Sequence, residues 1–160
     1  MKQRIRRQKR REKLAGQGKK VRIIQFIKED KRTGEYRFLR NVSDLIDIHT
    51  LGRGFVMRPD DKTKDREAAL EAWDLARQTI ETGEHELVVL DELTYPIKFG
   101  FLEEDEVLRT IASRPQHVHI VVTGRDAPER LIDAADLVTE MVNRRHPMDI
   151  GIKAQKGIEF

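Results

Sequence analysis

The sequence predicts an α/β protein with a parallel sheet flanked by helices, and three observations support this prediction. The run Leu87-Val88-Val89-Leu90 is apolar throughout and two of its residues are β-branched, which is typical of a strand buried on both faces. Residues 21–27 and 117–122 have a similar strand character. Helical periodicity separates these runs, and strands that alternate with helices form parallel sheets. We therefore expect three or four parallel strands covered by helices.

The clearest predicted helix spans residues 64–81. Its apolar residues recur every three or four positions, with Trp73 as the expected core anchor, and Gly83 marks its end. The other predicted elements are helices over 103–113 and 128–135, strands over 45–48 and 136–141, and a loop-rich tail over 143–160.

Length and composition predict one intracellular domain. A chain of 160 residues can bury one full core but not two ordinary ones. The sequence has no cysteine, so it offers neither disulfides nor thiolate metal ligands, as suits a reducing cytoplasm. We find neither a signal-peptide apolar region nor a membrane-length apolar run, and we expect a soluble cytoplasmic protein with no membrane partner.

The charge is unevenly distributed between an N-terminal arm, residues 1–15, and the predicted domain, residues 16–160. Residues 1–22 contain eleven Lys and Arg and one acidic residue, whereas the remaining residues contain 20 basic and 27 acidic ones. A basic arm is most often a solvated or helical extension, although it can also bind nucleic acid or lipid. Because no recognition-helix or base-stacking pattern accompanies it, we expect no specific nucleic-acid binding.

An acidic pair, Asp91 and Glu92, directly follows the buried run 87–90. In open α/β sheets ligands bind at the carboxyl ends of strands, where carboxylates can hold hydrated Mg²⁺ beside a phosphate. The alternative is a solvated acidic turn, and this motif alone does not decide between the two.

Polar residues also follow two other predicted strands. Lys28 comes after residues 21–27, and Thr123-Gly124-Arg125 comes after residues 117–122. Parallel strands end at one edge, so these residues should open into the same crevice as the acidic pair. Lys28 and Arg125 would there neutralise a polyphosphate, Arg125 with two hydrogen bonds.

Three other motifs have simpler interpretations. Residues 16–20 resemble part of a phosphate loop but lead into a strand, so we interpret them as a turn. Phe55 and Met57 lie in a glycine-punctuated loop, where they either serve a ligand or pack beneath the loop as a small apolar cluster. His117 and His119 share a strand face but lack a third ligand, which favours surface or hydrogen-bonding histidines over a metal site.

Several motifs, in matching order and spacing, resemble those of the bacterial ATP:corrinoid adenosyltransferases. The resemblance covers about residues 16 to 160. The motifs are Gln25-Phe26-Ile27-Lys28, Gly54-Phe55, Leu90-Asp91-Glu92-Leu93-Thr94-Tyr95, Arg114-Pro115, Thr123-Gly124-Arg125, Ala135-Asp136 and the tail 149–160.

This resemblance implies a cytoplasmic homodimer with a P-loop NTPase (RecA-like) fold. It implies transfer of the 5′-deoxyadenosyl group of ATP to the cobalt of a reduced corrinoid, with release of triphosphate, in adenosylcobalamin biosynthesis or salvage. An electron donor would reduce the cobalt. The protein would act through positioning and charge stabilisation.

The same resemblance implies roles for individual residues. Asp91 and Glu92 would hold Mg²⁺ and ATP and, with Arg125, form the catalytic set. Phe55 would belong to the corrinoid loop, and Met57 stands where relatives often have Trp. The cofactor-binding positions would be Lys28, Phe55, Met57, Thr94, Tyr95, Thr123 and Gly124.

The chain departs from the family at its start. Between the basic arm and the segment matching Gly16, relatives carry an apolar first strand, a Walker A phosphate loop and a helix, and this sequence has none of them. Two other hypotheses therefore stay open. One is a catalytically impaired corrinoid-binding remnant that has lost the phosphate loop, and the other is a nucleic-acid binder that uses the basic arm.

Overall fold

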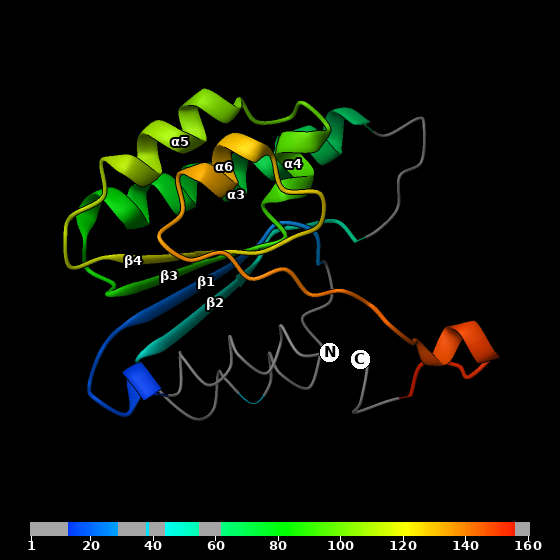
Figure 1. Ribbon diagram of the computed structural model, residues 1–160. Helices are drawn as coiled ribbons and strands as arrows, with labels where there is room; N and C mark the ends of the chain where they lie inside the picture. Colours follow the sequence, from blue (N-terminus) through cyan, green and yellow to red (C-terminus); the bar gives the residue numbers. More distant parts are fainter. Residues whose placement is uncertain (1–12, 29–37, 39–43, 55–61, 156–160) are drawn as a thin grey trace.

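A computed structural model describes residues 13–28, 38, 44–54 and 62–155 of the chain (Figure 1). Phe55 and Met57 lie outside the described residues, as do most of the basic arm and the end of the tail. Across the described ranges, no helix is both long enough and apolar enough to cross a membrane.

The centre of the fold is a four-stranded parallel sheet with the order β2-β1-β3-β4. The strands are β1 (Val21–Gln25), β2 (Ile46–Thr50), β3 (Leu87–Asp91) and β4 (His119–Val122). Every residue of β3 is buried, as the apolar run predicted. The predicted parallel α/β architecture is therefore confirmed. Among the described residues no strand precedes β1.

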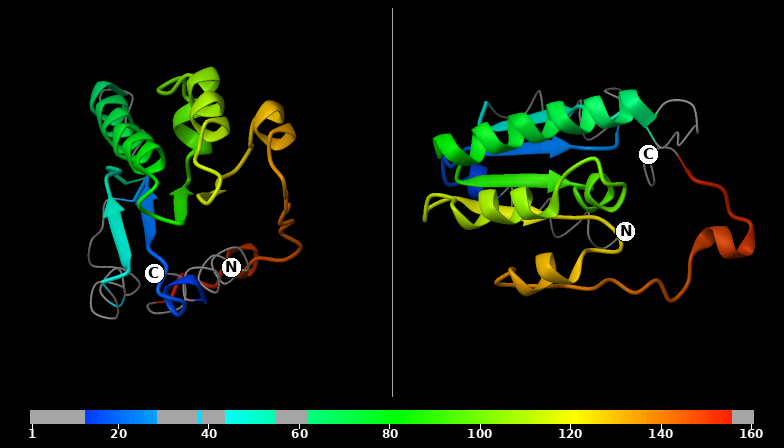
Figure 2. Two further views of the ribbon diagram at one scale, coloured as in Figure 1. Left: turned by 90° about the vertical axis from the view of Figure 1, so that its left-hand side faces the viewer. Right: turned by 90° about the horizontal axis from the view of Figure 1, so that it is seen from above.

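Helices cover one face of this sheet, as Figures 1 and 2 show. The long helix α3 (Lys62–Thr82) and the helix α5 (Glu104–Ala112) confirm the two longer predicted helices. The short elements are α4 (Thr94–Lys98), α6 (Glu129–Asp133) and the 3₁₀ turn η2 (Pro147–Ile150). Trp73 is 2% exposed and anchors α3 in the core, as predicted.

Side-chain alternation along the strands gives the sheet two apolar faces. On the helix side, Ile24, Val88 and Leu90 pack with the buried residues of α3 and with Val107 of α5. The opposite face is a second cluster, in which Leu14 and Ala15 pack against the core. The buried members of that cluster are Val21, Ile23, Ile46, Ile48, Leu87 and Val89.

The sheet ends at β4 among the described residues, and two predictions fail there. Residues 117–122 were expected to form a buried strand, but β4 is exposed at His119 and only half-buried afterwards. Residues 136–141 were expected to form a strand, but they adopt no regular structure. A buried strand needs partners, and no described strand lies beyond β4.

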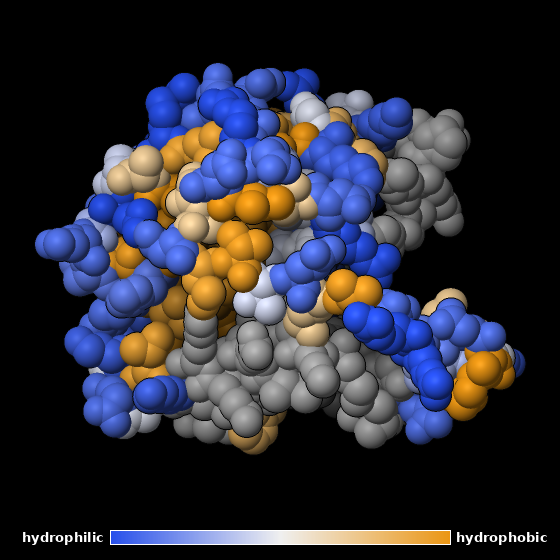
Figure 3. All heavy atoms as spheres, viewed as in Figure 1, coloured by the Kyte–Doolittle hydropathy of each residue, from blue (hydrophilic) through white to orange (hydrophobic). Residues whose placement is uncertain are grey.

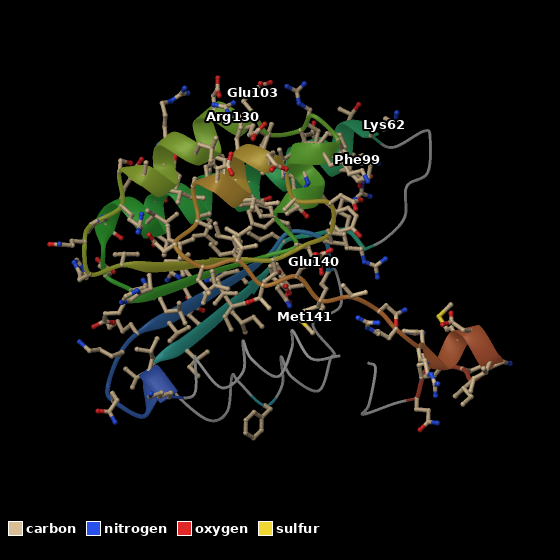
Figure 4. The ribbon with its side chains drawn as sticks, viewed as in Figure 1. Lys62, Phe99, Glu103, Arg130, Glu140 and Met141 are labelled. Atoms are coloured by element: carbon tan, nitrogen blue, oxygen red, sulfur yellow. The ribbon has the colours of Figure 1, made fainter. Side chains whose placement is uncertain are left out.

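The segment after α6 nevertheless runs alongside this edge. Both views of Figure 2 place it beyond β4, on the side away from β3. Figure 4 labels Glu140 and Met141 on it. Leu137 and Val138 are 67% and 51% exposed, and Figure 3, which looks onto this side, shows apolar side chains around α6 and the sheet edge. Apolar residues that would suit a strand interior are thus left at the surface.

Candidate functional site at the carboxyl end of the sheet

Four polar residues form a row across the carboxyl ends of the strands. In the strand register, Gln25 of β1 is level with Thr50 of β2 and with Asp91 of β3. Thr123 follows β4 directly, and its backbone N–H donates to Leu90 O at 3.1 Å. Because the strands are parallel, one residue from each strand end reaches the same level. We call Thr50, Gln25, Asp91 and Thr123 the polar row.

Hydrogen bonds connect the side chains of the polar row. Thr50 Oγ1 donates to Gln25 Oε1 at 3.1 Å, and Gln25 Nε2 donates to Asp91 Oδ2 at 3.1 Å. From the other side, Thr123 Oγ1 donates to Asp91 Oδ1 at 2.9 Å. Each carboxylate oxygen of Asp91 therefore accepts one of these lateral bonds.

Asp91 and Glu92 differ sharply in their surroundings. Asp91 is only 5% exposed, whereas Glu92 is half-buried. Glu92 has a left-handed backbone with φ 66°, unusual for a residue with a side chain. Its N–H donates to Thr123 Oγ1 at 3.1 Å, which ties the turn to the polar row. The chain thus changes direction sharply after Asp91.

Thr94 begins α4 and lies against the loop that follows β4. It is 1% exposed, and its Oγ1 has no hydrogen-bond partner among the described residues. A Cβ built on Gly124 would lie 1.8 Å from that oxygen. The structure therefore brings together Asp91, Thr94, Thr123 and Gly124, four of the predicted site residues.

An aromatic strip runs from α4 into the turn that follows it. The rings of Tyr95 and Phe99 are 6.1 Å apart, and those of Phe99 and Phe101 are 5.9 Å apart. Figure 4 shows Phe99 at the end of the molecule where the strands end. Tyr95, another predicted site residue, is half-buried within this strip.

An ion pair joins α4 to the loop after β4. Lys98 Nζ lies 2.6 Å from Asp126 Oδ2. The hydrogen bond and charge of Asp126 raise the pKa of Lys98, and the same contacts lower the pKa of Asp126. Both groups are exposed, so the pair contributes little to stability. It links α4 to the loop that carries Arg125.

The two predicted cationic residues lie at the same edge as the acidic pair. Lys28 is half-buried three residues after β1, and Arg125 is exposed three residues after β4. The glycine segment before Phe55 is also anchored here, because Gly52 N donates to Gln25 O at 3.2 Å and Gly54 N donates to Ile27 O at 2.7 Å. The loop predicted to contact corrinoid therefore starts beside β1.

The oxygen ligands present suit Mg²⁺ better than a transition metal. Within the described ranges, no group of three His, Cys, Asp or Glu side chains could enclose a metal ion. Mg²⁺ commonly uses one or two carboxylates and completes its octahedron with water and substrate phosphates. Asp91 and Glu92 fit that pattern, with the phosphates of a nucleotide as the further ligands.

Fold and site together define a class of protein. A parallel sheet packed against helices, a buried carboxylate at the end of a central strand and polar loops on its neighbours are typical of α/β proteins that bind ligands at the carboxyl ends of their strands. The comparisons with known proteins identify the family within this class. Residues 12–160 match the model of the family described as ATP:corrinoid adenosyltransferase BtuR/CobO/CobP.

Individual relatives agree with the family model. A corrinoid adenosyltransferase of Pseudomonas aeruginosa is 46% identical over 145 residues, which cover 91% of this chain and 71% of the relative. One of Escherichia coli K12 is 32% identical, with 91% and 73% covered. One of Sinorhizobium sp is 39% identical over 140 residues, with 86% and 65% covered. The chain belongs to the ATP:corrinoid adenosyltransferase family, and it spans roughly two thirds to three quarters of these relatives' lengths.

The sequence analysis did not single out two residues of the candidate site, Gln25 and Thr50. Gln25 was noted only within a family motif, and Thr50 was not noted at all. The signal for both is the parallel register, because Gln25 and Thr50 are level with Asp91 across neighbouring strands. Their polar character at strand positions that continue the buried apolar alternation of Val21 and Ile23 or of Ile46 and Ile48 could have indicated a shared site.

Proposed function

We propose that this chain transfers the 5′-deoxyadenosyl group of ATP to the cobalt of a reduced corrinoid and releases triphosphate, with Asp91 and Glu92 at the Mg²⁺ end of the site. Membership of the adenosyltransferase family supports the reaction class. The observation that carries the assignment within this chain is the buried Asp91 carboxylate, held between Gln25 and Thr123 at the carboxyl end of β3.

The chemistry of the proposed site is electrostatic. Mg²⁺ would neutralise charge that develops on the leaving triphosphate, and Asp91 with Glu92 would hold the ion through oxygen ligands. Lys28 and Arg125 would add positive charge from the ends of β1 and β4, with Arg125 able to bind a phosphate through two N–H groups. Thr94, Thr123 and Gly124 would line the nucleotide side.

The corrinoid side of the site would be built by the loop that starts at Gly52. Phe55 and Met57 would face the macrocycle, and Tyr95 at α4 would lie on the nucleotide side. An apolar surface against the lower face of the corrin favours loss of the axial ligand there, which makes the cobalt easier to reduce. With Met57 in place of the Trp common in relatives, this surface is less aromatic.

Three further features belong to the same proposal. The active form would be a cytoplasmic homodimer, the metal would be Mg²⁺, and a separate electron donor would reduce the cobalt of the corrinoid. The proposal includes no specific nucleic-acid binding. We therefore expect a variant without residues 1–13 to be retained on a nucleic-acid column as weakly as the wild type.

The alternative function is corrinoid binding without catalysis. It is motivated by the missing Walker A segment, since a phosphate loop supplies backbone N–H groups and a Lys to the triphosphate. Family membership favours the enzyme. A spectral titration of corrinoid with and without ATP separates the two, because ATP-independent binding by a protein that fails to bind ATP would support the remnant.

The decisive experiment measures adenosylation of chemically reduced corrinoid with ATP and Mg²⁺. The wild-type chain should form adenosylcorrinoid, and Asp91→Asn should lose about 100-fold in rate, the scale of losing one preorganised electrostatic contact. Asp133→Asn is the matched control, because Asp133 is exposed on α6. A wild-type chain without turnover, beside a full-length relative that works, would reject the proposal for this polypeptide.

A further inference from the structure

The polar row is directional, and its direction follows from the acceptor at its centre. An ionised carboxylate can only accept hydrogen bonds. Gln25 must therefore present its NH₂ to Asp91 Oδ2, 3.1 Å away, and its Oε1 must face Thr50. Because Oε1 can only accept, the Thr50 hydroxyl must donate to it, at 3.1 Å. Asp91 thus fixes which end of the Gln25 amide faces it, and Thr50 supplies the donor that the other end of the amide needs.

The other side of Asp91 is oriented in the same way. Thr123 Oγ1 uses its single proton for Asp91 Oδ1, at 2.9 Å. The same oxygen accepts from the backbone N–H of Glu92 at 3.1 Å. The carboxylate is therefore held from two sides, by Gln25 of β1 and by Thr123 directly after β4.

Gln25 and Thr50 are polar side chains buried on an otherwise apolar part of the sheet. Gln25 and Thr50 are 4% and 7% exposed, and they lie on the sheet face that also carries the apolar residues Ile23 and Ile48. A buried amide or hydroxyl destabilises the fold when it lacks hydrogen-bond partners. Apolar residues would fill this position in the sheet at lower risk, so packing alone does not explain the two polar side chains.

We infer that Gln25 and Thr50 are positioning residues, which hold the Asp91 carboxylate in the orientation that it needs to bind the metal of the bound nucleotide. Neither residue touches the substrate; each acts through Asp91. This inference rests on the proposed function for the role of Asp91. The hydrogen-bond row itself is independent of that role.

Thr50→Val tests the inference with a nearly isosteric change. It removes the only donor that the row offers to Gln25 Oε1. That buried oxygen is then left unpaired, so the amide is no longer held in place against Asp91. We expect the Mg²⁺ concentration for half-maximal adenosylation to rise by about tenfold, the scale found for lost outer partners of metal ligands. The kcat at saturating Mg²⁺ should change much less, and Thr50→Ser should restore the Mg²⁺ dependence.

The matched control is Thr82→Val on α3. Thr82 Oγ1 donates to Thr79 O at 3.2 Å, and neither residue belongs to the polar row. The variant therefore loses one hydroxyl hydrogen bond that does not involve Asp91. Its Mg²⁺ dependence should equal that of the wild type. An unchanged Mg²⁺ dependence in Thr50→Val, or a defect that Thr50→Ser does not restore, would overturn the inference.

Two measurements keep the test separate from the proposed function. Mn²⁺ binding in the presence of ATP, followed by electron paramagnetic resonance, needs no turnover and should weaken in Thr50→Val. A crystal structure of the same variant should show the Gln25 amide turned away from Asp91. If the wild type neither turns over nor binds Mn²⁺ with ATP, the proposed function fails. The crystal structure of Thr50→Val then decides by itself whether Thr50 positions the Gln25 amide. An amide that still donates to Asp91 Oδ2 would then refute positioning by Thr50.

Discussion

Gly124 lies so close to Thr94 that the two residues leave no room for a side chain between them. A Cβ on Gly124 would lie 1.8 Å from Thr94 Oγ1 and 2.8 Å from Thr94 Cβ, and the glycine has φ 154°. The contact joins the first turn of α4 to the loop after β4. It also lies next to the polar row, because Thr123 precedes the glycine.

Gly124→Ala should therefore destabilise the fold and disturb the site together. The new methyl group must displace Thr94, which is buried, and overpacking of this kind costs about 1–3 kcal/mol. We expect a lower free energy of unfolding in urea and a higher KM for ATP.

Gly100→Ala is the control for backbone strain, because Gly100 has φ 68° and a Cβ on it would meet no other atom within 4 Å. If Gly124→Ala lowers the free energy of unfolding no more than Gly100→Ala does, the loop moves freely and the close contact with Thr94 is unimportant.

A second close approach fixes the start of the corrinoid loop. A Cβ on Gly52 would lie 2.1 Å from the backbone carbon of Ile27, and a backbone atom cannot move aside as a side-chain tip can. Gly52→Ala should break the hydrogen bonds that Gly52 and Gly54 donate to β1 and to Ile27. We expect weaker corrinoid binding in a spectral titration, with ATP binding less affected. Unchanged corrinoid affinity would place the corrinoid away from this loop.

How far the sequence predicted the fold depended on where each element finds its partners. β3 is predictable because Leu87 to Leu90 are buried by neighbours on both sides, so the local pattern and the tertiary environment agree. Residues 136–141 have an equally plausible strand pattern, but strand formation requires a neighbouring ladder. No described strand supplies one, and a local pattern contains no information about a missing neighbour.

The site shows the same division. Asp91 was predictable because an acid stands at the end of an apolar run, and Thr123 because it follows another strand. Gln25 and Thr50 are recognised as site residues only through the strand register. Thr50 lies 25 positions from Gln25 in the sequence, and Gln25 lies 66 positions from Asp91. The left-handed backbone of Glu92 has no sequence signal, because left-handed backbone usually marks glycine or asparagine.

His85 should make stability depend on pH at the opposite end of the sheet. It is 7% exposed, and its Nδ1 has no hydrogen-bond partner among the described residues. Burial, and then the positive charge of Arg22, lower its pKa below the ordinary value. The unfolded chain then binds the proton more readily. The stabilising contribution of neutral His85 is complete above about pH 6.5 and is lost as the pH falls through the folded-state pKa.

His85→Gln should reduce this dependence. Urea unfolding between pH 8 and pH 5 should give a shallower fall in the free energy of unfolding for the variant than for the wild type, by at most about 1.4 kcal/mol per pH unit for a single proton. The exposed His119 supplies the control variant His119→Gln. If His85→Gln and the wild type lose stability in parallel, His85 is not the titrating group.

The outer edge of β4 should exchange its amide hydrogens quickly. The N–H groups of His119 and Thr123 donate to Glu86 O and Leu90 O on the β3 side. In a parallel pair, alternate residues bond to the same neighbour, so the N–H groups of Ile120 and Val122 point away from β3.

Hydrogen exchange by NMR should show the amides of Ile120 and Val122 exchanging about 100-fold or more faster than those of Val88 and Val89, since edge amides open at much lower free energy. His119 in β4 and Thr123 directly after it provide the control, and spectra at two protein concentrations exclude protection by self-association. Protection of Ile120 and Val122 equal to that of β3 would mean that another segment completes the sheet beyond β4.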